Sequence, residues 1–272
     1  MFYDLHVHTN KSDGKYSRIE LLKRANDLQM RYLSFTDHDY LDNENIKAQY
    51  EQLYGKCKVK LIDGIEFTVE DYKNMHILGY GMKNKDLIIH LLKKIKLENI
   101  NICKRLIYNL NNYYGFDLNL NDYSNYDLSK GLIRQMLVDK NITENLKIAG
   151  DLYTGINSRF YEKTHALKML QIISLIKLAK GVSVLAHPSV LGLENSELDL
   201  LIKNLKCNGL DGIEILNQSK TTQTQSEYYE YLAKKYDLLM SCGSDFHNEK
   251  STPIFGVNNN KSRKIIRKIR KM

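Results

Sequence analysis

Short apolar, β-branched runs recur along this chain, and stretches with helical spacing separate several of them. The runs have the length and composition of buried strands. They cover residues 2–8, 32–36, 59–66, 76–80, 182–186, 210–216 and 238–242. Helical patterns cover residues 17–28, 164–179 and 226–235. Strands that alternate with helices predict an α/β fold with a mainly parallel sheet.

Two local patterns refine this prediction. Ser17 and Glu20 match a capping box, which predicts the start of the first helix. The runs that contain Glu66 and His76 lie close together in sequence. Those two strands are therefore expected to form a hairpin or to be joined by a short connection.

The segment 91–161 interrupts the alternation. It is rich in Asn, Lys, Tyr and Leu, and it is mostly helical in pattern. The 272 residues suit one α/β barrel. We therefore divide the chain into a first barrel part (1–90), a helical insertion (91–161) and a second barrel part (162–272). We expect the insertion to cap the mouth of the barrel.

Candidate metal ligands cluster near the ends of the strand-like runs. Six of the eight histidines and three carboxylates form this set: His6, His8, Asp13, His38, Glu66, His76, His187, Asp245 and His247. In a barrel the carboxyl ends of the strands converge on the active site. Residues i and i+2 of a strand share a face, so a His-x-His pair can point into one site.

The ligand types indicate a multinuclear catalytic site. Structural zinc sites usually take four ligands, often thiolates, whereas this set contains no cysteine. Mixed imidazole and carboxylate ligation suits Mn²⁺, Fe²⁺ or Zn²⁺. The set exceeds the need of one ion and suits two or three. Such a cluster fits phosphoester hydrolysis, because metal ions generate hydroxide at neutral pH and clamp the attacking and leaving oxygens.

Composition fits a protein of the cytoplasm. Apolar residues make up 43% and charged residues 26% of the chain. No secretory signal or apolar run of ~20 residues is visible, so we expect no membrane partner. The four cysteines are scattered, which favours buried free thiols in a reducing compartment.

The net charge of +8 is concentrated in residues 261–271. Ile265, Ile266 and Ile269 share a helical face there. The favoured interpretation is a final amphipathic helix with a solvated basic side. The alternative is attraction of a polyanionic substrate, such as a nucleotide or a short oligonucleotide.

Five motifs in order carry a family resemblance. They are residues 6–14 (HVHTNKSDG), 36–39 (TDHD), 64–66 (GIE), 186–188 (AHP) and 243–247 (GSDFH). Together they resemble the PHP (polymerase and histidinol phosphatase) family, over about residues 1–90 and 165–257. The resemblance implies a distorted (β/α)7, TIM-like barrel with a trinuclear metal site.

The resemblance also implies how the ligands share two to three ions of Mn, Fe or Zn. One ion would be held by His6, His8, Glu66 and Asp245. A second would share Glu66 and add His76 and His187. A third would use Asp13, His38 and His247.

The motif around Asp13 resembles one branch of the family. Histidinol phosphatases more often have His at this position. The Ser-Asp-Gly form, with the insertion, resembles the branch that cleaves nucleotide monophosphates, 3′,5′-bisphosphates and short RNA from the 5′ end. That branch typically carries Arg-Pro-His where this chain has Lys130-Gly131-Leu132. Lys130 offers phosphate a point charge without the bidentate fork of arginine. With Arg134 and Arg159 it is a candidate for substrate binding.

We expect a phosphoesterase in which metal-bound hydroxide attacks phosphorus. Asp39 or a metal-bound water would act as general acid. The partner would be a small phosphorylated substrate, a nucleotide or a short 5′-phosphorylated RNA, and the sequence leaves the oligomeric state open. Asp37 would orient an imidazole ring, and Glu214 is expected to have a structural role or to bond a ligand.

Three alternatives remain. The first is histidinol-phosphate phosphatase, which Asp13 disfavours. The second is a non-catalytic metal-binding accessory module, which the complete ligand set disfavours. The third is metal-dependent amide hydrolysis, because some amidohydrolases also begin with His-x-His; those commonly use a bridging lysine, whereas Glu66 fills the bridging role here.

Overall fold

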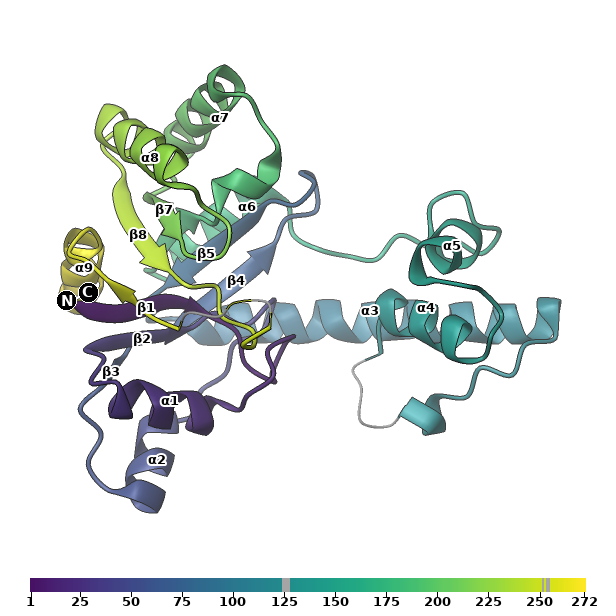
Figure 1. Cartoon of the computed structure of the whole chain (residues 1–272). Coiled ribbons are helices and arrows are strands. Elements are labelled where there is room, and N and C mark those ends of the chain that lie inside the picture. The colour runs from purple at the N-terminus through teal and green to yellow at the C-terminus, as the bar shows by residue number, and fades with distance from the viewer. Residues whose placement is uncertain (124–127, 251, 253–254) are drawn as a thin grey trace. The chain divides into compact units, whose positions relative to one another are not determined.

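The computed structural model describes residues 1–123, 128–250, 252 and 255–272, and the chain divides into two compact units (Figure 1). The first unit contains Met1–His90 and Leu167–Met272. The second unit contains Leu91–Ala166. All of the predicted metal ligands belong to the first unit.

The first unit contains two sheets. The four-stranded sheet has the order β3-β2-β1-β9, with β1 (Phe2–Val7), β2 (Tyr32–Phe35), β3 (Lys60–Leu61) and β9 (Val257–Asn258). The five-stranded sheet has the order β4-β5-β6-β7-β8, with β4 (Gly64–Thr68), β5 (His76–Tyr80), β6 (Val182–Leu185), β7 (Gly212–Asn217) and β8 (Leu239–Gly243).

Strand β5 runs against both of its neighbours. It pairs antiparallel with β4, where Thr68 lies opposite His76, and antiparallel with β6. The predicted hairpin between Glu66 and His76 is therefore confirmed. The remaining pairs are parallel, except that β9 runs antiparallel to β1.

Main-chain bonds link the two sheets at both junctions. The amide of His8 donates to the carbonyl of Phe246 at 2.9 Å, beside an isolated bridge between Val7 and Phe246. The amide of Asp39 donates to the carbonyl of Glu66 at 2.9 Å. The predicted α/β class is thus confirmed as a mixed α/β fold, and closure into a barrel stays a prediction.

The prediction of one strand over residues 59–66 is wrong. The chain forms β3 in one sheet, turns at Ile62 and Asp63, and enters β4 of the other sheet. Gly64 lies at this change of sheet. A Cβ there would overlap Ser34 Oγ and lie 2.9 Å from the carbonyl oxygen of Phe35, so the close approach of β4 to β2 requires glycine.

Helices connect most of the strands of the first unit. They are α1 (Arg18–Asp27), α2 (Ile46–Tyr54), α6 (Met169–Leu178), α7 (Asn195–Cys207) and α8 (Gln223–Lys235). The predicted capping box at Ser17 and Glu20 is confirmed. Helix α6 begins later than predicted, because Leu167 forms an isolated bridge with Val69 instead of a helical turn.

The core beneath α1 and α2 is apolar. Leu21, Leu22 and Ala25 of α1 pack with Leu33 of β2 and Tyr50 of α2 in one buried cluster. The sequence did not predict α2 or α7. Val7, at the end of β1, belongs to the same cluster, so this packing fixes the strand that carries the His-x-His motif.

The basic end of the chain forms α9 (Arg263–Lys271), which lies beside the start of β1 (Figure 1). Ile265 and Ile266 are buried, as the amphipathic interpretation predicts. Lys268 Nζ donates to Asp211 Oδ1 at 2.6 Å. The attraction of a polyanion to the basic face stays a prediction.

The second unit is mostly helical, as the insertion was expected to be. Helix α3 (Lys85–Tyr114) begins before its first boundary, and α4 (Lys130–Asp139), α5 (Leu146–Ala149) and a π-helical turn at Gly150–Thr154 follow. Ile133, Met136 and Leu137 of α4 lie in its buried apolar cluster. The capping role stays a prediction.

Two further expectations concern membranes and thiols. Among the described residues, none of the helices combines the length and apolar character needed to cross a bilayer. The four cysteines are free. Cys57, Cys103 and Cys242 are buried as predicted, whereas Cys207 is exposed at the end of α7.

Candidate metal centre

The predicted ligands come together at one edge of the two sheets. His6 and His8 lie at the end of β1, and His38, His187 and Asp245 follow β2, β6 and β8. His76 is the first residue of β5, not one that follows a strand. It reaches the same edge because β5 runs antiparallel to its neighbours.

Glu66 lies at the centre of this cluster. Its Oε1 is 2.8 Å from His187 Nε2 and 2.9 Å from His76 Nδ1. Its Oε2 is 3.0 Å from His8 Nε2, 3.2 Å from His6 Nε2 and 3.4 Å from His38 Nδ1. Five imidazoles therefore face one buried carboxylate, which suits a ligand that bridges two cations.

Asp245 and Asp13 extend the cluster. Asp245 Oδ1 lies 3.2 Å from His8 Nε2 and 3.4 Å from His6 Nε2. Asp13 Oδ2 lies 3.3 Å from His247 Nε2. Because Asp13 is half exposed, the cluster runs from a buried end at His6 to an open end at Asp13.

Three sets of ligand atoms are close enough to hold a metal ion each, with the atoms of a set within 4.8 Å of one another. They are His6, His8, Glu66 and Asp245; His8, Asp13, His38 and His247; and His38, Glu66 and His76. His187 reaches the cluster through Glu66 and lies 3.3 Å from His76 Nδ1.

Buried polar atoms in the cluster indicate that cations fit there. His6 Nε2, His8 Nε2 and Glu66 Oε2 make no hydrogen bond of regular geometry among the described residues, although they face one another. Buried polar atoms are rarely left in this state. Imidazole nitrogens and carboxylate oxygens that converge on one space are the donor set of Mn²⁺, Fe²⁺ or Zn²⁺.

The electrostatics fit the same interpretation. Burial would lower the pKa of His8, but the neighbouring Asp245 and Glu66 outweigh it and raise this pKa to about 9. Burial would raise the pKa of Glu66, but His6 and the other imidazoles hold it well below its usual value. Burial lowers the pKa of His38 to about 4 despite the attraction of Glu66. The site thus keeps carboxylates ionised where cations would bind.

Glu214 supports two of the histidines. Its Oε1 lies 3.0 Å from His6 Nδ1, and its Oε2 accepts the main-chain N–H of His187 at 2.7 Å. The hydrogen bond predicted between Glu214 and a ligand is therefore confirmed. Such a bond fixes the tautomer of His6, so that Nε2 points at the cluster with its lone pair.

Asp37 fixes a loop instead of an imidazole ring. It accepts the main-chain N–H of Thr9 at 2.7 Å, the hydroxyl of Ser12 at 2.9 Å and the guanidinium of Arg18 at 3.1 Å. The expectation that it orients a ring is wrong. Its contacts hold the chain between His8 and Asp13, a role that the sequence pattern did not predict.

Asp4 is a second support, and it lies outside the five sequence motifs. Its carboxylate accepts the main-chain N–H of His6, Ser244 and Gly256 and the hydroxyl of Ser244. Burial raises its pKa to about 6 although these bonds oppose the shift. A buried carboxylate two residues before His6, on the same strand face, was the available signal.

The backbone is strained at the cluster. His187, Asp245 and Asp39 adopt positive φ angles of 22°, 57° and 47°. Non-glycine residues rarely adopt this conformation, and such strain collects at functional sites. The turns after β2, β6 and β8 are thus shaped to aim side chains at one place.

A family comparison decides the identity of the fold. The model of the PHP domain matches residues 4–272. The chain belongs to the PHP family. The resemblance carried by the five motifs is therefore confirmed.

Curated PHP relatives match most of the chain. A 5′-3′ exoribonuclease of Haemophilus influenzae is 28% identical over 255 residues, 90% of this chain and 89% of the relative. A phosphoribosyl 1,2-cyclic phosphate 1,2-diphosphodiesterase of Eggerthella lenta is 28% identical over 262 residues, covering 92% and 95%. A 3′,5′-nucleoside bisphosphate phosphatase of Chromobacterium violaceum is 24% identical over 250 residues, covering 90% and 86%.

Two solved structures share the PHP fold. A protein of Bifidobacterium adolescentis, described as a metal-dependent phosphoesterase, superposes with a TM-score of 0.72, 22% identity and coverage of 98% and 96%. A protein of Chromobacterium violaceum, described as an amidohydrolase, superposes with a TM-score of 0.72, 21% identity and coverage of 99% and 96%. At these identities the likeness concerns the fold alone.

Asp39 adjoins the ligand cluster through its main chain, whose N–H donates to the carbonyl of Glu66. Its carboxylate accepts the main-chain N–H of Thr68 at 3.1 Å. Its side chain reaches solvent, but surrounding protein atoms desolvate the carboxylate and raise its pKa. Its predicted role as general acid stays a prediction.

The three cations predicted to bind substrate all make contacts within the second unit. Lys130 Nζ donates to the carbonyl of Glu162 at 2.5 Å. Arg134 Nε donates to Thr154 Oγ1 at 2.7 Å. Arg159 stacks 4.2 Å from the ring centre of Tyr113. Their roles in substrate binding stay predictions.

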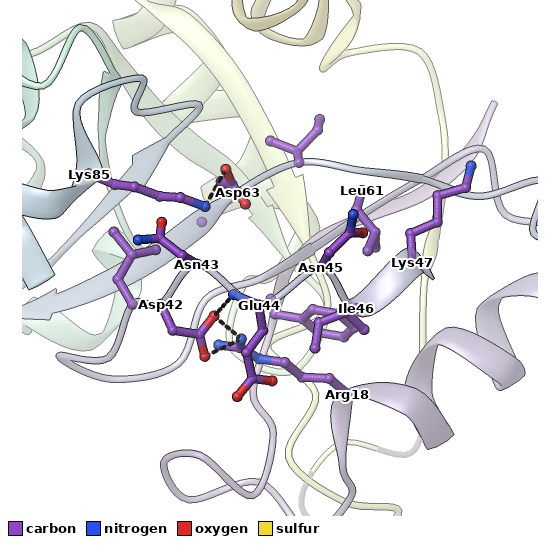
Figure 2. Close-up of a pocket in the computed structure, with 14 residues that line it drawn as sticks. Arg18, Asp42, Asn43, Glu44, Asn45, Ile46, Lys47, Leu61, Asp63 and Lys85 are labelled. Atoms are coloured by element: carbon purple, nitrogen blue, oxygen red, sulfur yellow. Dashed lines mark hydrogen bonds and ion pairs between the residues drawn. The ribbon is translucent and has the colours of Figure 1, made fainter. Parts of the chain in front are cut away.

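Two cavities differ in their relation to the PHP ligands. A cavity of about 300 Å³ lies beside the ion pair of Arg18 and Asp42, with Lys85 and Asp63 on its wall (Figure 2). None of the predicted ligands lines it. A cavity of about 470 Å³ is lined by Asp13, Asp245 and His247, so this one gives access to the metal centre.

Proposed function

We propose that this chain is a metal-dependent phosphoesterase that hydrolyses phosphomonoesters of nucleotides, or short 5′-phosphorylated oligonucleotides. The observation that carries the proposal is the arrangement of five imidazoles around the buried carboxylate of Glu66. The names of the curated relatives, which span about nine tenths of the chain, support the substrate class.

Two or three divalent ions are the proposed cofactors, and Glu66 would help to hold two of them. When bound, such ions lower the pKa of a bound water and neutralise charge on phosphoryl oxygens. His6, His8, Glu66 and Asp245 would hold one ion, His76 and His187 with Glu66 a second, and Asp13, His38 and His247 a third. Manganese, iron and zinc all suit this donor set.

The chain's own groups would order the site around the substrate. Glu214 holds His6 in one tautomer, and Asp37 fixes the loop that leads to Asp13. Asp39 is proposed as the group that protonates the leaving oxygen, because its raised pKa favours holding a proton. The open end at Asp13 would admit the phosphate.

Other parts of the proposal concern the whole chain. We infer that the two sheets close into a distorted (β/α)7 barrel through the bridges at Val7 and His38. The insertion is proposed to cap the mouth, with Lys130, Arg134 and Arg159 as substrate contacts. Free cysteines suit a cytoplasmic setting.

The test is phosphate release by Mn²⁺-loaded protein from adenosine 3′,5′-bisphosphate and 5′-AMP, together with release of mononucleotides from a short 5′-phosphorylated oligoribonucleotide. Histidinol phosphate and phosphoribosyl 1,2-cyclic phosphate serve as comparison substrates, the second because of the Eggerthella lenta relative. Turnover of nucleotides above the comparison substrates supports the proposal. Turnover of histidinol phosphate alone, or of none of them with metal bound, contradicts it.

A further inference from the structure

Lys220 brings a cation to the candidate metal centre from the loop that follows β7. Its Nζ forms an ion pair with Asp245 Oδ2, while 36% of its side chain stays exposed. We propose that Lys220 is the phosphate-binding residue of this site, and that its ammonium contacts phosphoryl oxygens of the substrate when metal ions occupy the centre. This inference rests on the proposed function and assigns a residue to it.

The loop that carries Lys220 is fixed to the same support as the ligands. Strand β7 ends at Asn217, whose Nδ2 donates to Glu214 Oε2 at 3.3 Å. The main-chain N–H groups of Lys220 and Thr221 both donate to the carbonyl of Asn217, at 3.2 and 2.9 Å. Because Glu214 also holds His6, the start of the Lys220 side chain has a set position relative to the ligands.

The turn is closed from its other side as well. Ser219 Oγ donates to Asn217 Oδ1 at 2.9 Å, and the main-chain N–H of Asn217 donates to Thr221 Oγ1 at 3.2 Å. The main-chain N–H of Gln218 donates to the carbonyl of Gly243 in β8 at 3.1 Å. A loop that is already held in one conformation lowers the entropic cost of ordering a long side chain when that side chain binds an anion.

The cavity of about 470 Å³ places Lys220 between the ligands and solvent. Lys220 and Ser219 line it together with Asp13, Asp245 and His247. An anion that enters this cavity therefore meets the ammonium and the predicted ligands at the same place. Asp13 and Asp245 would repel a phosphate unless cations neutralise them, so phosphate binding should depend on both metal and Lys220.

The ion pair between Lys220 and Asp245 would be released by metal binding, which would free the ammonium to bind phosphate. Asp245 is a predicted ligand, and a metal ion bound to its carboxylate would replace Lys220 as its counter-charge. The Lys220 side chain would then lie between the open cavity, which it lines, and the buried ligand cluster. A lysine supplies a point charge, which suits the terminal phosphoryl group of many substrates without selecting among their leaving groups.

The cations of the insertion have other partners. Lys130 bonds to a main-chain carbonyl, Arg134 to Thr154 and Arg159 to a ring face. Lys220 is paired with a predicted metal ligand instead. Lys220 and Asp245 both belong to the first unit, so the position of Lys220 beside the predicted ligands does not depend on the second unit.

The experiment is calorimetric titration of inorganic phosphate into Mn²⁺-loaded wild-type protein and the Lys220→Met variant, with bound manganese measured in both. Loss of a charged hydrogen bond should weaken phosphate binding about 10–100-fold, with manganese content unchanged. Lys220→Arg should recover part of the affinity. Lys235→Met, which removes the ion pair between Lys235 of α8 and Asp199 of α7, is the matched control and should bind phosphate like wild type.

Turnover adds a second measurement. If the contact is equal in the ground and transition states, Lys220→Met raises KM by the same factor and leaves kcat nearly unchanged. Phosphate affinity equal to wild type in Lys220→Met would overturn the proposal, because Lys220 would then only neutralise Asp245. Loss of bound manganese in that variant would also overturn it, because Lys220 would then be a support for the ligands.

The two proposals fail separately. Phosphate titration needs no turnover, so a protein that binds phosphate through Lys220 but hydrolyses none of the substrates contradicts the proposed function alone. A protein that hydrolyses nucleotides while Lys220→Met keeps its KM and its phosphate affinity contradicts the Lys220 assignment alone.

Discussion

His6 Nδ1 lies 3.0 Å from Oε1 of Glu214, and both side chains are buried. The other oxygen of Glu214 accepts the main-chain N–H of His187 and the amide of Asn217. Both oxygens of one carboxylate therefore act as acceptors. This arrangement links the strand ends of β1, β6 and β7 at the base of the metal centre.

Glu214→Gln should weaken metal binding about 10–100-fold. The amide nitrogen of glutamine must replace one of two acceptor oxygens, so either His6 or His187 loses its partner. Metal titration with a fluorescent competitor measures the change. The circular dichroism spectrum should stay that of wild type. Glu227→Gln on the exposed face of α8 is the control, and equal affinity in both variants would refute the role of Glu214.

Asp245→Asn and His6→Ala should each reduce turnover at least about 10³-fold while the fold survives. Each removes one donor from the set that surrounds His8 and Glu66. Phosphate release and bound metal are measured on the same samples. A folded His6→Ala protein with wild-type rates would reject the proposed centre.

The sequence predicted most of the strands, and the structure brings the predicted ligands together, for a physical reason. Apolar runs with polar ends are local patterns, and β1 and β5 lie where those patterns place them. The motif residues cluster because the strands that carry them end at one edge. The direction of β5 followed from the short connection between Glu66 and His76.

The features that the sequence did not show depend on contacts across the chain. Asp37 bonds to Thr9 and Arg18, which are 28 and 19 residues away in sequence. Lys220 reaches Asp245 from another strand's loop. No local spacing encodes such pairs. The split of residues 59–66 into β3 and β4 was also hidden, because both sheets bury apolar residues.

Gly243→Ala should destabilise the protein by about 1–3 kcal/mol, because a Cβ at this position would overlap the main chain and side chain of His6. The end of β8 must then move away from β1, so metal affinity should fall together with stability. Denaturant unfolding of metal-free protein measures the first effect, and metal titration measures the second.

Gly131→Ala is the matched control for this substitution. Its added Cβ would meet Ser129 Oγ at 3.5 Å, an ordinary contact, and the position lies inside α4. Alanine should stabilise that helix by about 0.5–1 kcal/mol. Similar losses of stability in both variants would contradict the close approach of β8 to β1.

One terminal nitrogen of Arg18 bonds to Asp37 at 3.1 Å, and the other bonds to Asp42 at 2.9 Å. Figure 2 shows the contact with Asp42. Burial would raise the pKa of Asp42, but Arg18 and hydrogen bonds lower it below its usual 3.8. A carboxyl whose folded-state pKa is depressed stabilises the fold above its unfolded-state pKa and loses that contribution as the pH falls through the folded-state value.

Asp42→Asn should therefore lower the free energy of unfolding by about 1–2 kcal/mol at neutral pH. The difference from wild type should stay constant down to about pH 4 and shrink below it, as Asp42 of the wild type becomes protonated. Denaturant unfolding of metal-free protein between pH 3 and 7 measures this. Asp151→Asn, which breaks the exposed ion pair with Lys147, is the control and should lower the free energy of unfolding by less than about 1 kcal/mol. A difference that persists unchanged at pH 3 would show that Asp42 acts through shape or hydrogen bonding, and not through its charge beside Arg18.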